Sequence, residues 1–198
     1  MKRRTIVIGA GAAGLMAAGK AAERGLEVIL LEKNDRPGRK LRISGKGRCN
    51  ITNDTDIDGL IENIPGNGSF LYSSFYTFSN EDIMQFFRDE GLELKVERGG
   101  RVFPVTDDAR DVVSVLVKRA ERNGAEIRYR SPVSSIEVSD GSVRAVKLKN
   151  SETIECDSVV IATGGASYPG TGSTGDGYRI VQELGHTVTP LKPSLVPL

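Results

Sequence analysis

Apolar residues gather in short runs at the start of the chain, and two of these runs have the length and composition of buried strands. Thr5 to Ile8 is a β-branched run that ends at a glycine, and Leu26 to Leu31 is a second apolar run. Between them, the alanine-rich segment from Leu15 to Arg24 is typical of a helix that ends at Gly25. The order of strand, glycine turn, helix and strand predicts a βαβ unit.

The middle of the chain predicts a helix followed by a β-hairpin. Residues 81–90 carry apolar side chains on one helical face. Residues 92–96 then alternate between apolar and polar side chains, and a Gly-Gly pair turns the chain into residues 101–103. This alternation around a glycine turn is the pattern of a hairpin.

A second helix and several short strands are expected next. Asp107 or Asp108 is expected to cap a helix that ends at Gly124. Residues 125–154 predict three or four short strands, with a tight turn at Asp140 and Gly141.

The last quarter of the chain repeats the succession of strand, glycine-rich loop and helix. Residues 159–161 are wholly apolar and predict a buried strand that runs into a small-residue turn. A glycine-rich loop covers residues 168–177, and residues 176–184 are expected to be helical. Residues 190–198 are expected to be extended.

Composition narrows the class of protein without naming a function. The chain has 198 residues, of which 38% are hydrophobic and 27% charged, and its net charge is +1. This is an ordinary globular mixture, and no global field would recruit nucleic acid or a membrane. No stretch reaches the roughly 18 apolar residues that a membrane helix needs. The basic residues at the N-terminus superficially resemble a signal peptide, but the apolar pattern continues into the βαβ unit.

Cysteine usage favours a reducing compartment. Cys49 and Cys156 are the only cysteines, and no spacing typical of a metal site or a disulfide framework occurs. We therefore expect a cytoplasmic protein without a metal.

The glycine pattern between the first strand and the first helix carries the sharpest chemical signal. Gly9, Gly11 and Gly14 form a GxGxxG motif in its required context, and Glu32 ends the next strand. Gly9 permits the tight turn, Gly11 lets a pyrophosphate approach the backbone, and Gly14 allows close packing of helix and strand. The helix N-terminus offers free N–H groups to the phosphates, and the acid can accept bonds from ribose hydroxyls. The motif predicts a Rossmann-like dinucleotide-binding domain, but it does not separate FAD from NAD.

A basic, glycine-rich loop follows the second strand. It is a further candidate for cofactor binding, beside the GxGxxG motif and the small-residue turn at residues 162–165. Every charged residue between positions 36 and 48 is a cation. The loop is expected to lie over a pyrophosphate and a flavin, where its cations would stabilise negative charge. A solvated loop and a nucleic-acid patch are the alternatives, and the absence of aromatic residues within the span disfavours the latter. The cations are Arg36, Arg39, Lys40, Arg42, Lys46 and Arg48.

Three further features invite a functional interpretation that we do not favour. His186 is the only histidine and is expected in a loop or on the surface. Cys49 lies among cations that would lower a thiol pKa, yet it has no partner cysteine. The aromatic cluster between Phe70 and Phe78 is expected to cover a core, with a substrate pocket as the alternative.

Several stretches spread over nearly the whole chain carry a family resemblance. They are GAGAAGLMAA (9–18), LEKNDRPGRKLRISGKGRCNITN (31–53), GRVFPVTDDA (100–109), VVIATGGASYPGTGSTGDGY (159–178) and PSLVPL (193–198). The sequence resembles the N-terminal portion of the BaiN/YhiN-like family of FAD-dependent oxidoreductases, which also includes aminoacetone-oxidase-like flavoproteins.

This resemblance implies which residues contact FAD. The glycine loop would hold the pyrophosphate and Glu32 the ribose, while the basic loop would approach pyrophosphate, ribityl chain and flavin. The backbone of Val133 would meet adenine, the turn at residues 162–165 would lie by the cofactor, and the loop from Thr171 to Tyr178 would lie near the flavin edge. The full expected set is Gly9, Gly11, Ala12, Ala13, Gly14, Glu32, Lys33, Gly38, Arg39, Lys40, Ser44, Gly45, Gly47, Arg48, Cys49, Asn50, Val133, Ala162, Thr163, Gly164, Gly165 and Asp176.

The resemblance also sets the expected architecture and activity. We expect an α/β, Rossmann-like domain with a parallel sheet and a small antiparallel β element, which spans residues 1–190 and is incomplete. Residues 191–198 would begin the linker to an inserted substrate domain. The complete protein would pass hydride between a small organic substrate or NAD(P)H and FAD. No nucleic-acid or membrane partner is expected, and a non-catalytic dinucleotide-binding module and an NAD-dependent dehydrogenase are the alternatives.

Overall fold

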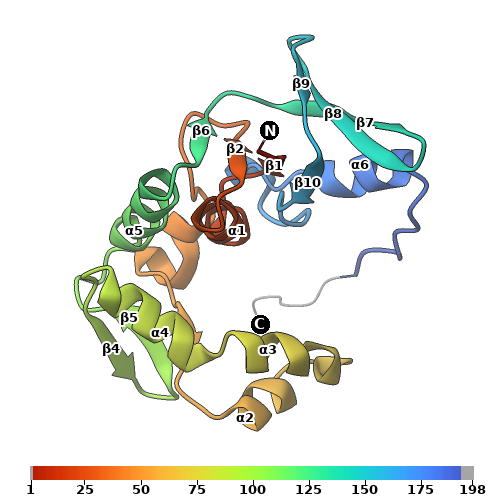
Figure 1. Cartoon of the computed structure of the whole chain (residues 1–198). Helices are drawn as coiled ribbons and strands as arrows, with labels where there is room; N and C mark the ends of the chain where they lie inside the picture. The colour runs from red at the N-terminus through yellow and green to blue at the C-terminus, as the bar shows by residue number, and fades with distance from the viewer. Residues whose placement is uncertain (1, 193–198) are drawn as a thin grey trace.

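A parallel four-stranded sheet forms the centre of the protein (Figure 1). The computed structural model describes residues 2–192. In the sheet, β1 (Arg4–Ile8) lies between β2 (Glu27–Leu31) and β10 (Ser158–Ile161), and β6 (Glu126–Arg128) pairs with the outer side of β2. Ile8 is in register with Leu31 and Ile161, so these strands end together at one edge. The expected βαβ unit and Rossmann-like fold are confirmed.

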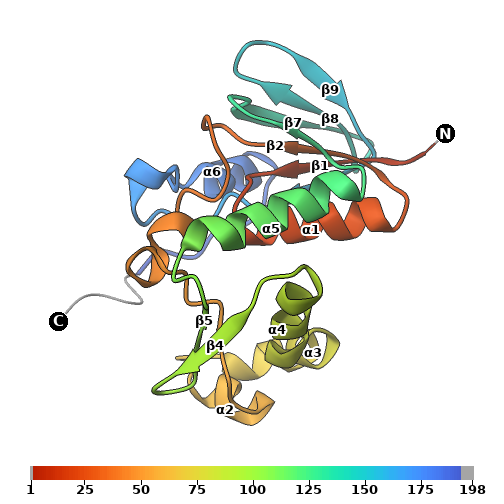
Figure 2. The same ribbon diagram turned by 90° about the vertical axis from the view of Figure 1, so that its left-hand side faces the viewer.

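The two faces of this sheet are covered by different layers, because successive side chains on a strand point to opposite sides. Val7 and Leu30 face the helices α1 (Ala12–Glu23) and α5 (Ala109–Arg122), which lie side by side in Figure 2. Ile6 and Ile29 face the opposite layer, which holds an antiparallel sheet and α6 (Asp176–Glu183). The apolar runs that form β1 and β2 are therefore buried on both faces of the sheet.

The antiparallel layer is the small β element that the sequence predicted. It consists of β7 (Val133–Ser139), β8 (Ser142–Leu148) and β9 (Thr153–Glu155). The turn between β7 and β8 is where expected, since Asp140 and Gly141 have φ angles of 52° and 69°, which suit a two-residue hairpin turn. The first strand of the 125–154 region, β6, instead joins the parallel sheet.

A second lobe lies below α1 and α5 in Figure 2. It contains an antiparallel sheet of β3 (Thr52–Asn53), β5 (Arg101–Pro104) and β4 (Leu94–Glu97), together with α4 (Asn80–Asp89). The predicted hairpin is confirmed as the pair β4 and β5. Ser79 and Asp82 form a capping box that starts α4, and Asp108 caps α5 as one of the two expected residues.

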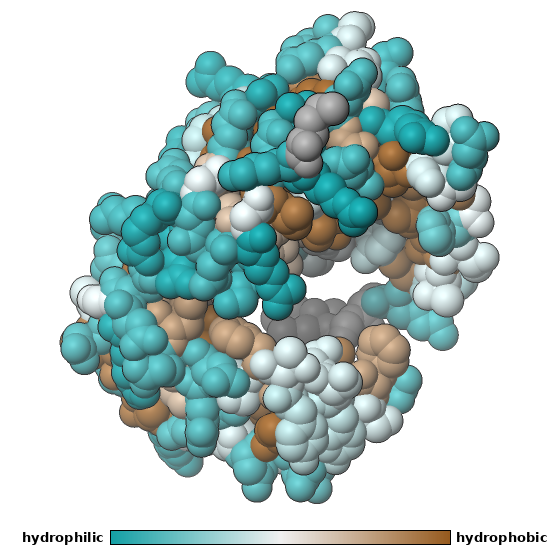
Figure 3. Space-filling view, in the orientation of Figure 1, coloured by the Kyte–Doolittle hydropathy of each residue, from teal (hydrophilic) through white to brown (hydrophobic). Residues whose placement is uncertain are grey.

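A helical arm extends this lobe. The expectation that the aromatic cluster of this segment covers a core is wrong for its most exposed residues. The arm comprises α2 (Ile57–Glu62), the 3-10 helix η2 (Gly68–Leu71) and α3 (Tyr72–Thr77). Phe70 and Tyr76 do not cover a core, because they are 77% and 72% exposed, whereas Phe75 is half-buried. Figure 3 shows that an opening separates the lobes on this face. These short helices bury few apolar side chains, and aromatic residues close in sequence here remain at the surface.

Other differences from the predicted elements are local. The basic loop contains a short 3-10 element, η1 (Leu41–Gly47), that is interrupted by non-helical backbone at residues 44–46. A further 3-10 turn, η3 (Pro169–Thr171), precedes α6. β10 is not fully buried: it is an edge strand among the described residues, and Val160 is 37% exposed. None of the helices within residues 2–192 has the length and apolar character to cross a bilayer. The division at residue 190 stays a prediction, and residues 193–198 lie outside the described part.

Candidate cofactor site

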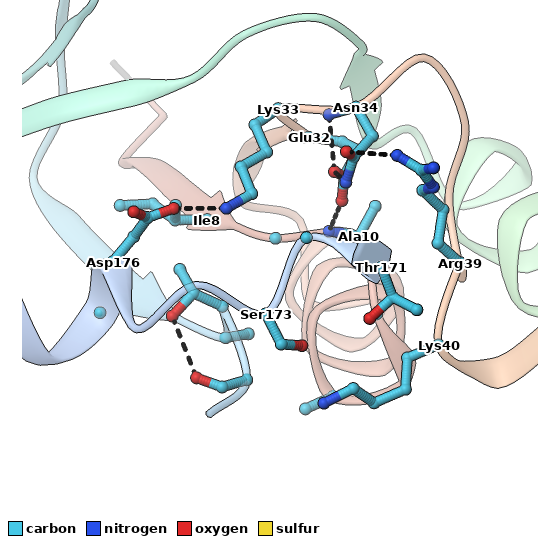
Figure 4. Close-up of a pocket in the computed structure, with 18 of the residues that line it drawn as sticks. Ile8, Ala10, Glu32, Lys33, Asn34, Arg39, Lys40, Thr171, Ser173 and Asp176 are labelled. Atoms are coloured by element: carbon cyan, nitrogen blue, oxygen red, sulfur yellow. Dashed lines mark hydrogen bonds and ion pairs between the residues drawn. The ribbon is translucent and has the colours of Figure 1, made fainter. Parts of the chain in front are cut away.

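A cleft of about 840 Å³ opens where β1, β2 and β10 end (Figure 4). In open α/β sheets, ligands bind outside the carboxyl ends of the strands, so this is the expected position for a nucleotide. The volume lies within the range of about 300–1,000 Å³ that is usual for ligand pockets. The cleft is bounded by the glycine loop, the end of β2, the basic loop and the loop that precedes α6.

The three motif glycines have different physical roles in the structure. Gly9 has a φ angle of +103°, and a Cβ there would lie 2.7 Å from the Ala162 carbonyl oxygen. A Cβ on Gly14 would lie 1.8 Å from the Gly9 carbonyl oxygen, so this glycine allows α1 to pack on the strand, and it does not line the cleft. Gly11 lines the cleft, and its Cβ position has no neighbour within 4 Å. The space above Gly11 is therefore free for a ligand.

The first turn of α1 completes an anion-binding surface. Gly11 is the N-cap, and no side chain caps the first N–H groups of the helix. Ala12 and Ala13 line the cleft with short side chains that leave the backbone accessible. Free N–H groups and the helix dipole both favour a phosphate at this point.

Glu32 is buried, and its carboxylate ties two walls of the cleft together (Figure 4). One oxygen accepts a hydrogen bond from the Ala10 N–H at 2.9 Å. The other accepts from the backbone N–H and the side-chain amide of Asn34, at 2.8 Å and 2.6 Å. A carboxylate offers about four acceptor positions, so one remains for a hydroxyl group in the cleft.

The first part of the basic loop is held against the glycine loop. The Gly38 N–H donates to the Ala10 carbonyl oxygen at 2.8 Å, and a Cβ on Gly38 would lie 2.6 Å from a methyl carbon of Val113. This contact places Arg39 and Lys40 on the cleft wall. Arg39 donates to the Asn34 side-chain oxygen at 2.9 Å, which continues the chain of bonds from Glu32.

The second part of the basic loop forms an arch whose two ends, Ser44 and Asn50, line the cleft. The expected contacts Gly45, Gly47, Arg48 and Cys49 are in the arch but do not line the cleft. Gly45, Gly47 and Cys49 have positive φ angles of 56°, 87° and 60°, which turn the chain away and back.

Arg48 points to the second lobe instead of the cleft. Its guanidinium lies 4.1 Å from the ring centre of Phe103 and 2.8 Å from the Glu97 carboxylate, with Asp107 at 3.4 Å. Not every cation of the basic loop can therefore neutralise a ligand in the cleft. No pattern in the sequence indicates this pairing, because Glu97 and Asp107 are distant from Arg48 along the chain.

The expectation that nearby cations lower the pKa of Cys49 is wrong. The thiol is buried in the core between the sheet and the helices, and burial raises its pKa. The position of Cys49 in the core favours a packing role. His186 is exposed and does not line the cleft.

The far wall of the cleft comes from the second glycine region. Ala162, Thr163 and Gly164 line it as expected, whereas Gly165 does not. Asp176, at the start of α6, also lines it.

Lys33 and Asp176 connect this wall to β2. The Lys33 ammonium lies 2.5 Å from the Asp176 carboxylate and 2.6 Å from the Thr174 hydroxyl (Figure 4). Burial is the largest single influence on the pKa of Asp176 and would raise it, but the hydrogen bond and the charge of Lys33, together with the Thr174 hydroxyl and the charge of Lys149, outweigh burial, and the pKa is lowered. Asp176 is therefore an ionised partner of Lys33 at neutral pH.

Val133 lines the cleft as expected, and the fold adds residues that no spacing in the sequence indicated. They come from the ends of β1 and β2 and from the segments that follow β2 and β6, where only the tertiary structure decides which side chain faces the cleft. The main additions are Ile8, Leu31, Asn34 and Ser131. The 171–178 loop, expected near the flavin edge, lines the cleft with residues that include Ser173 and Tyr178.

Curated relatives match the chain over almost its whole length. The ribosomal RNA dihydrouridine synthase of Escherichia coli K12 is 35% identical over 192 residues, which are 97% of this chain and 47% of that protein. The 3-dehydro-bile acid delta(4,6)-reductase of Clostridium scindens is 32% identical over 197 residues, or 97% of this chain and 46% of that protein. The chain thus spans about half the length of these relatives.

Solved structures share the fold. A flavocytochrome c3 fumarate reductase superposes with a TM-score of 0.69 at 24% identity, over 92% of this chain and 40% of that one. A 3-ketosteroid-delta4-(5alpha)-dehydrogenase from Rhodococcus jostii RHA1 gives a TM-score of 0.65 at 18% identity, over 84% and 47%. At these identities the likeness shows the fold alone.

A family model describes the chain almost completely. The model of the HI0933-like protein Rossmann domain matches residues 3–192, which include the glycine loop, the basic loop and the turn after β10. This match agrees with the family resemblance and supports FAD as the cofactor. The chain belongs to the HI0933-like protein Rossmann domain family.

Proposed function

We propose that this chain is the FAD-binding part of a flavin-dependent oxidoreductase. The observation that carries the proposal is the free space above Gly11, bounded by an uncapped helix N-terminus and by the buried carboxylate of Glu32. These groups suit the pyrophosphate and the ribose of a dinucleotide. When bound, FAD supplies hydride transfer, which no side chain of the protein can perform.

The residues of the cleft would bind and orient this cofactor. Backbone N–H groups at Gly11 and in the first turn of α1 would donate to the pyrophosphate, and Glu32 would accept from a ribose hydroxyl. Arg39 and Lys40, which line the cleft without a carboxylate partner in residues 2–192, would offset the phosphate charge. No residue is assigned as a catalytic acid or base.

The reaction class that the relatives support best is the reduction of a carbon–carbon double bond. The names of two relatives, a dihydrouridine synthase acting on ribosomal RNA and a bile acid reductase, both describe the addition of hydrogen to such a bond. We propose the same class for the complete protein, with NAD(P)H as the hydride donor. A small organic substrate and an RNA base are both compatible with these names, and the cytoplasmic location stays a prediction.

Cofactor binding by the purified chain tests the proposal. We expect FAD to bind with one molecule per chain, and Glu32→Gln to weaken binding about tenfold or more, because charge-assisted hydrogen bonds contribute about 1.5–3 kcal/mol each. Glu27→Gln is the matched control, since Glu27 begins β2, the strand that Glu32 follows, and pairs with Arg4 away from the cleft. Thermal unfolding of each variant without ligand separates lost affinity from lost folding.

Three outcomes would reject parts of this proposal. Failure of the wild-type chain to bind FAD, or unchanged affinity in Glu32→Gln, would reject the assigned site. Binding of NAD in place of FAD would favour the dehydrogenase alternative. FAD that stays oxidised when the longer protein meets NAD(P)H or substrate would favour a non-catalytic module.

A further inference from the structure

The arch between Ser44 and Asn50 has a backbone conformation that its own sequence does not favour. Lys46 and Cys49 both have φ angles of 60°, in the left-handed region that residues other than glycine rarely adopt. Within the arch, the Cys49 N–H donates to the Ser44 carbonyl oxygen at 3.0 Å, which closes the loop on itself. Strained backbone persists only where surrounding groups hold it, so contacts from outside the arch must select this shape.

Arg48 provides contacts of this kind with the second lobe. Its guanidinium lies over the buried ring of Phe103, 4.1 Å from the ring centre, and it is 2.8 Å from the Glu97 carboxylate and 3.4 Å from that of Asp107. Because a guanidinium is planar, it can lie on an aromatic face and bind carboxylates at its edge at the same time. The same ring meets the arch at Gly45, where a Cβ would lie 3.1 Å from a ring carbon. Phe103 therefore supports the arch at two points.

The end of the arch at Asn50 reaches the cofactor cleft. Asn50 lines the cleft, and within residues 2–192 its backbone N–H and its side-chain amide have no hydrogen-bond partner. Ser44, at the other end, also lines the cleft, but its hydroxyl already donates to the Leu41 carbonyl oxygen at 2.7 Å. A Cβ on Gly45 would lie 2.9 Å from the Asn50 nitrogen, so the arch packs directly against Asn50. A shift of the arch would therefore move Asn50, which is two residues from Arg48.

We propose that Arg48 is a positioning residue that fixes Asn50 for a hydrogen bond to bound FAD. Arg48 does not line the cleft, and its charge is paired with Glu97 and Asp107, so it acts through the arch and not on the cofactor itself. The side-chain amide of Asn50 would bond a polar group of the cofactor as donor, acceptor or both. This inference rests on the proposed function, because it requires FAD in the cleft. It also gives the second lobe a role, since Glu97 and Phe103 hold Arg48 in place.

Titration of flavin fluorescence with the 198-residue chain tests this role. Arg48→Met should weaken FAD binding about two- to tenfold, the effect of losing one neutral hydrogen bond, although Arg48 does not line the cleft. Arg48→Lys, which keeps a charge beside Glu97 but not the planar contact with Phe103, should give an intermediate affinity. The matched control is Arg101→Met, which should bind FAD like the wild type. The Arg101 guanidinium lies 5.9 Å from the centre of the same ring, but Arg101 belongs neither to the arch nor to the cleft.

A double-mutant cycle separates positioning from a general loss of structure. Asn50→Ala removes the side chain through which Arg48 acts, so in that background Arg48→Met should weaken FAD binding by less than about twofold. A purely structural role of Arg48 would instead reduce the affinity by the same factor in both backgrounds. If Arg48→Met does not fold, Glu97→Gln takes its place in the cycle, because it removes the shortest salt bridge of Arg48.

Hydrogen exchange without FAD measures the arch itself. The Cys49 N–H is bonded within the arch, so it should exchange faster in Arg48→Met than in the wild type. Arg101→Met should leave this exchange unchanged. Denaturant unfolding of each variant without ligand shows which of them are folded.

The proposal is overturned if Arg48→Met binds FAD as tightly as the wild type, if Arg101→Met loses as much affinity, or if the cycle shows no coupling between Arg48 and Asn50. Unchanged exchange of the Cys49 N–H would also overturn it. In each of these cases, FAD binding by the wild type would leave the proposed function standing. Failure of the wild type to bind FAD would instead reject the proposed function and the role of Asn50 with it, whatever the exchange of the arch shows.

Discussion

Replacement of Gly11 by alanine should weaken cofactor binding about tenfold or more while leaving the fold intact. Gly11 has an ordinary extended backbone, with φ −85° and ψ −169°, and a Cβ there would meet nothing within 4 Å. Alanine restricts the unfolded chain and so stabilises by about 0.4–1 kcal/mol, whereas alanine is a poorer N-cap than glycine by a similar amount. The two effects oppose each other, so the free energy of unfolding should change little.

The same methyl group would fill the space in which the pyrophosphate must approach the backbone. Loss of even one charge-assisted hydrogen bond costs about 1.5–3 kcal/mol, which is tenfold or more in affinity. FAD at a hundredfold excess over its Kd should stabilise the wild-type chain by about 2.7 kcal/mol, and a tenfold weaker variant would gain only about 1.4 kcal/mol. The variant should therefore lose about half or more of the stabilisation by FAD.

Denaturant unfolding with and without FAD, together with titration of flavin fluorescence, measures both quantities. Gly170→Ala is the matched control, because its Cβ also meets nothing within 4 Å but it does not line the cleft. If Gly11→Ala bound FAD as tightly as the wild type, the cleft above Gly11 could not be the phosphate site. If it unfolded the chain instead, the assignment of Gly11 as an open position would be wrong.

Three further predictions follow from the packing and the charges. Gly14→Ala should prevent folding, because its Cβ would lie 1.8 Å from the Gly9 carbonyl oxygen, and a cooperative thermal transition near that of the wild type would contradict this. The bond from Arg122 to Glu90 lowers the pKa of that carboxyl below its ordinary value of 4.5, so its stabilisation is complete above that pH and is lost as pH falls through the folded pKa. Denaturant unfolding against pH should show a shallower acid loss in Glu90→Gln, and identical curves would refute the pairing. Cys49 should react with a thiol reagent only on unfolding, since burial raises its pKa, and rapid labelling of the native chain would show that the core is open.

Local patterns in the sequence determined the elements that frame the cleft. The strands before and after the glycine loop, the helix between them and the position of Glu32 follow from runs of apolar residues and glycines within one βαβ unit. Such patterns are reliable because each element buries a face whose period is set by its own geometry. The hairpin at residues 94–104 and the turn at Asp140 were predictable for the same reason.

The tertiary structure decided every property that depends on which distant segments meet. Arg48 belongs to the basic loop in sequence, yet Glu97 and Phe103 draw it to the second lobe. Phe70 and Tyr76 of the arm remain exposed because no layer of the described residues covers them, and Lys40 of the basic loop contacts Ser167 across 127 positions. A sequence records the charge and the size of each side chain, but the direction in which a side chain points depends on the packing of layers far apart along the chain.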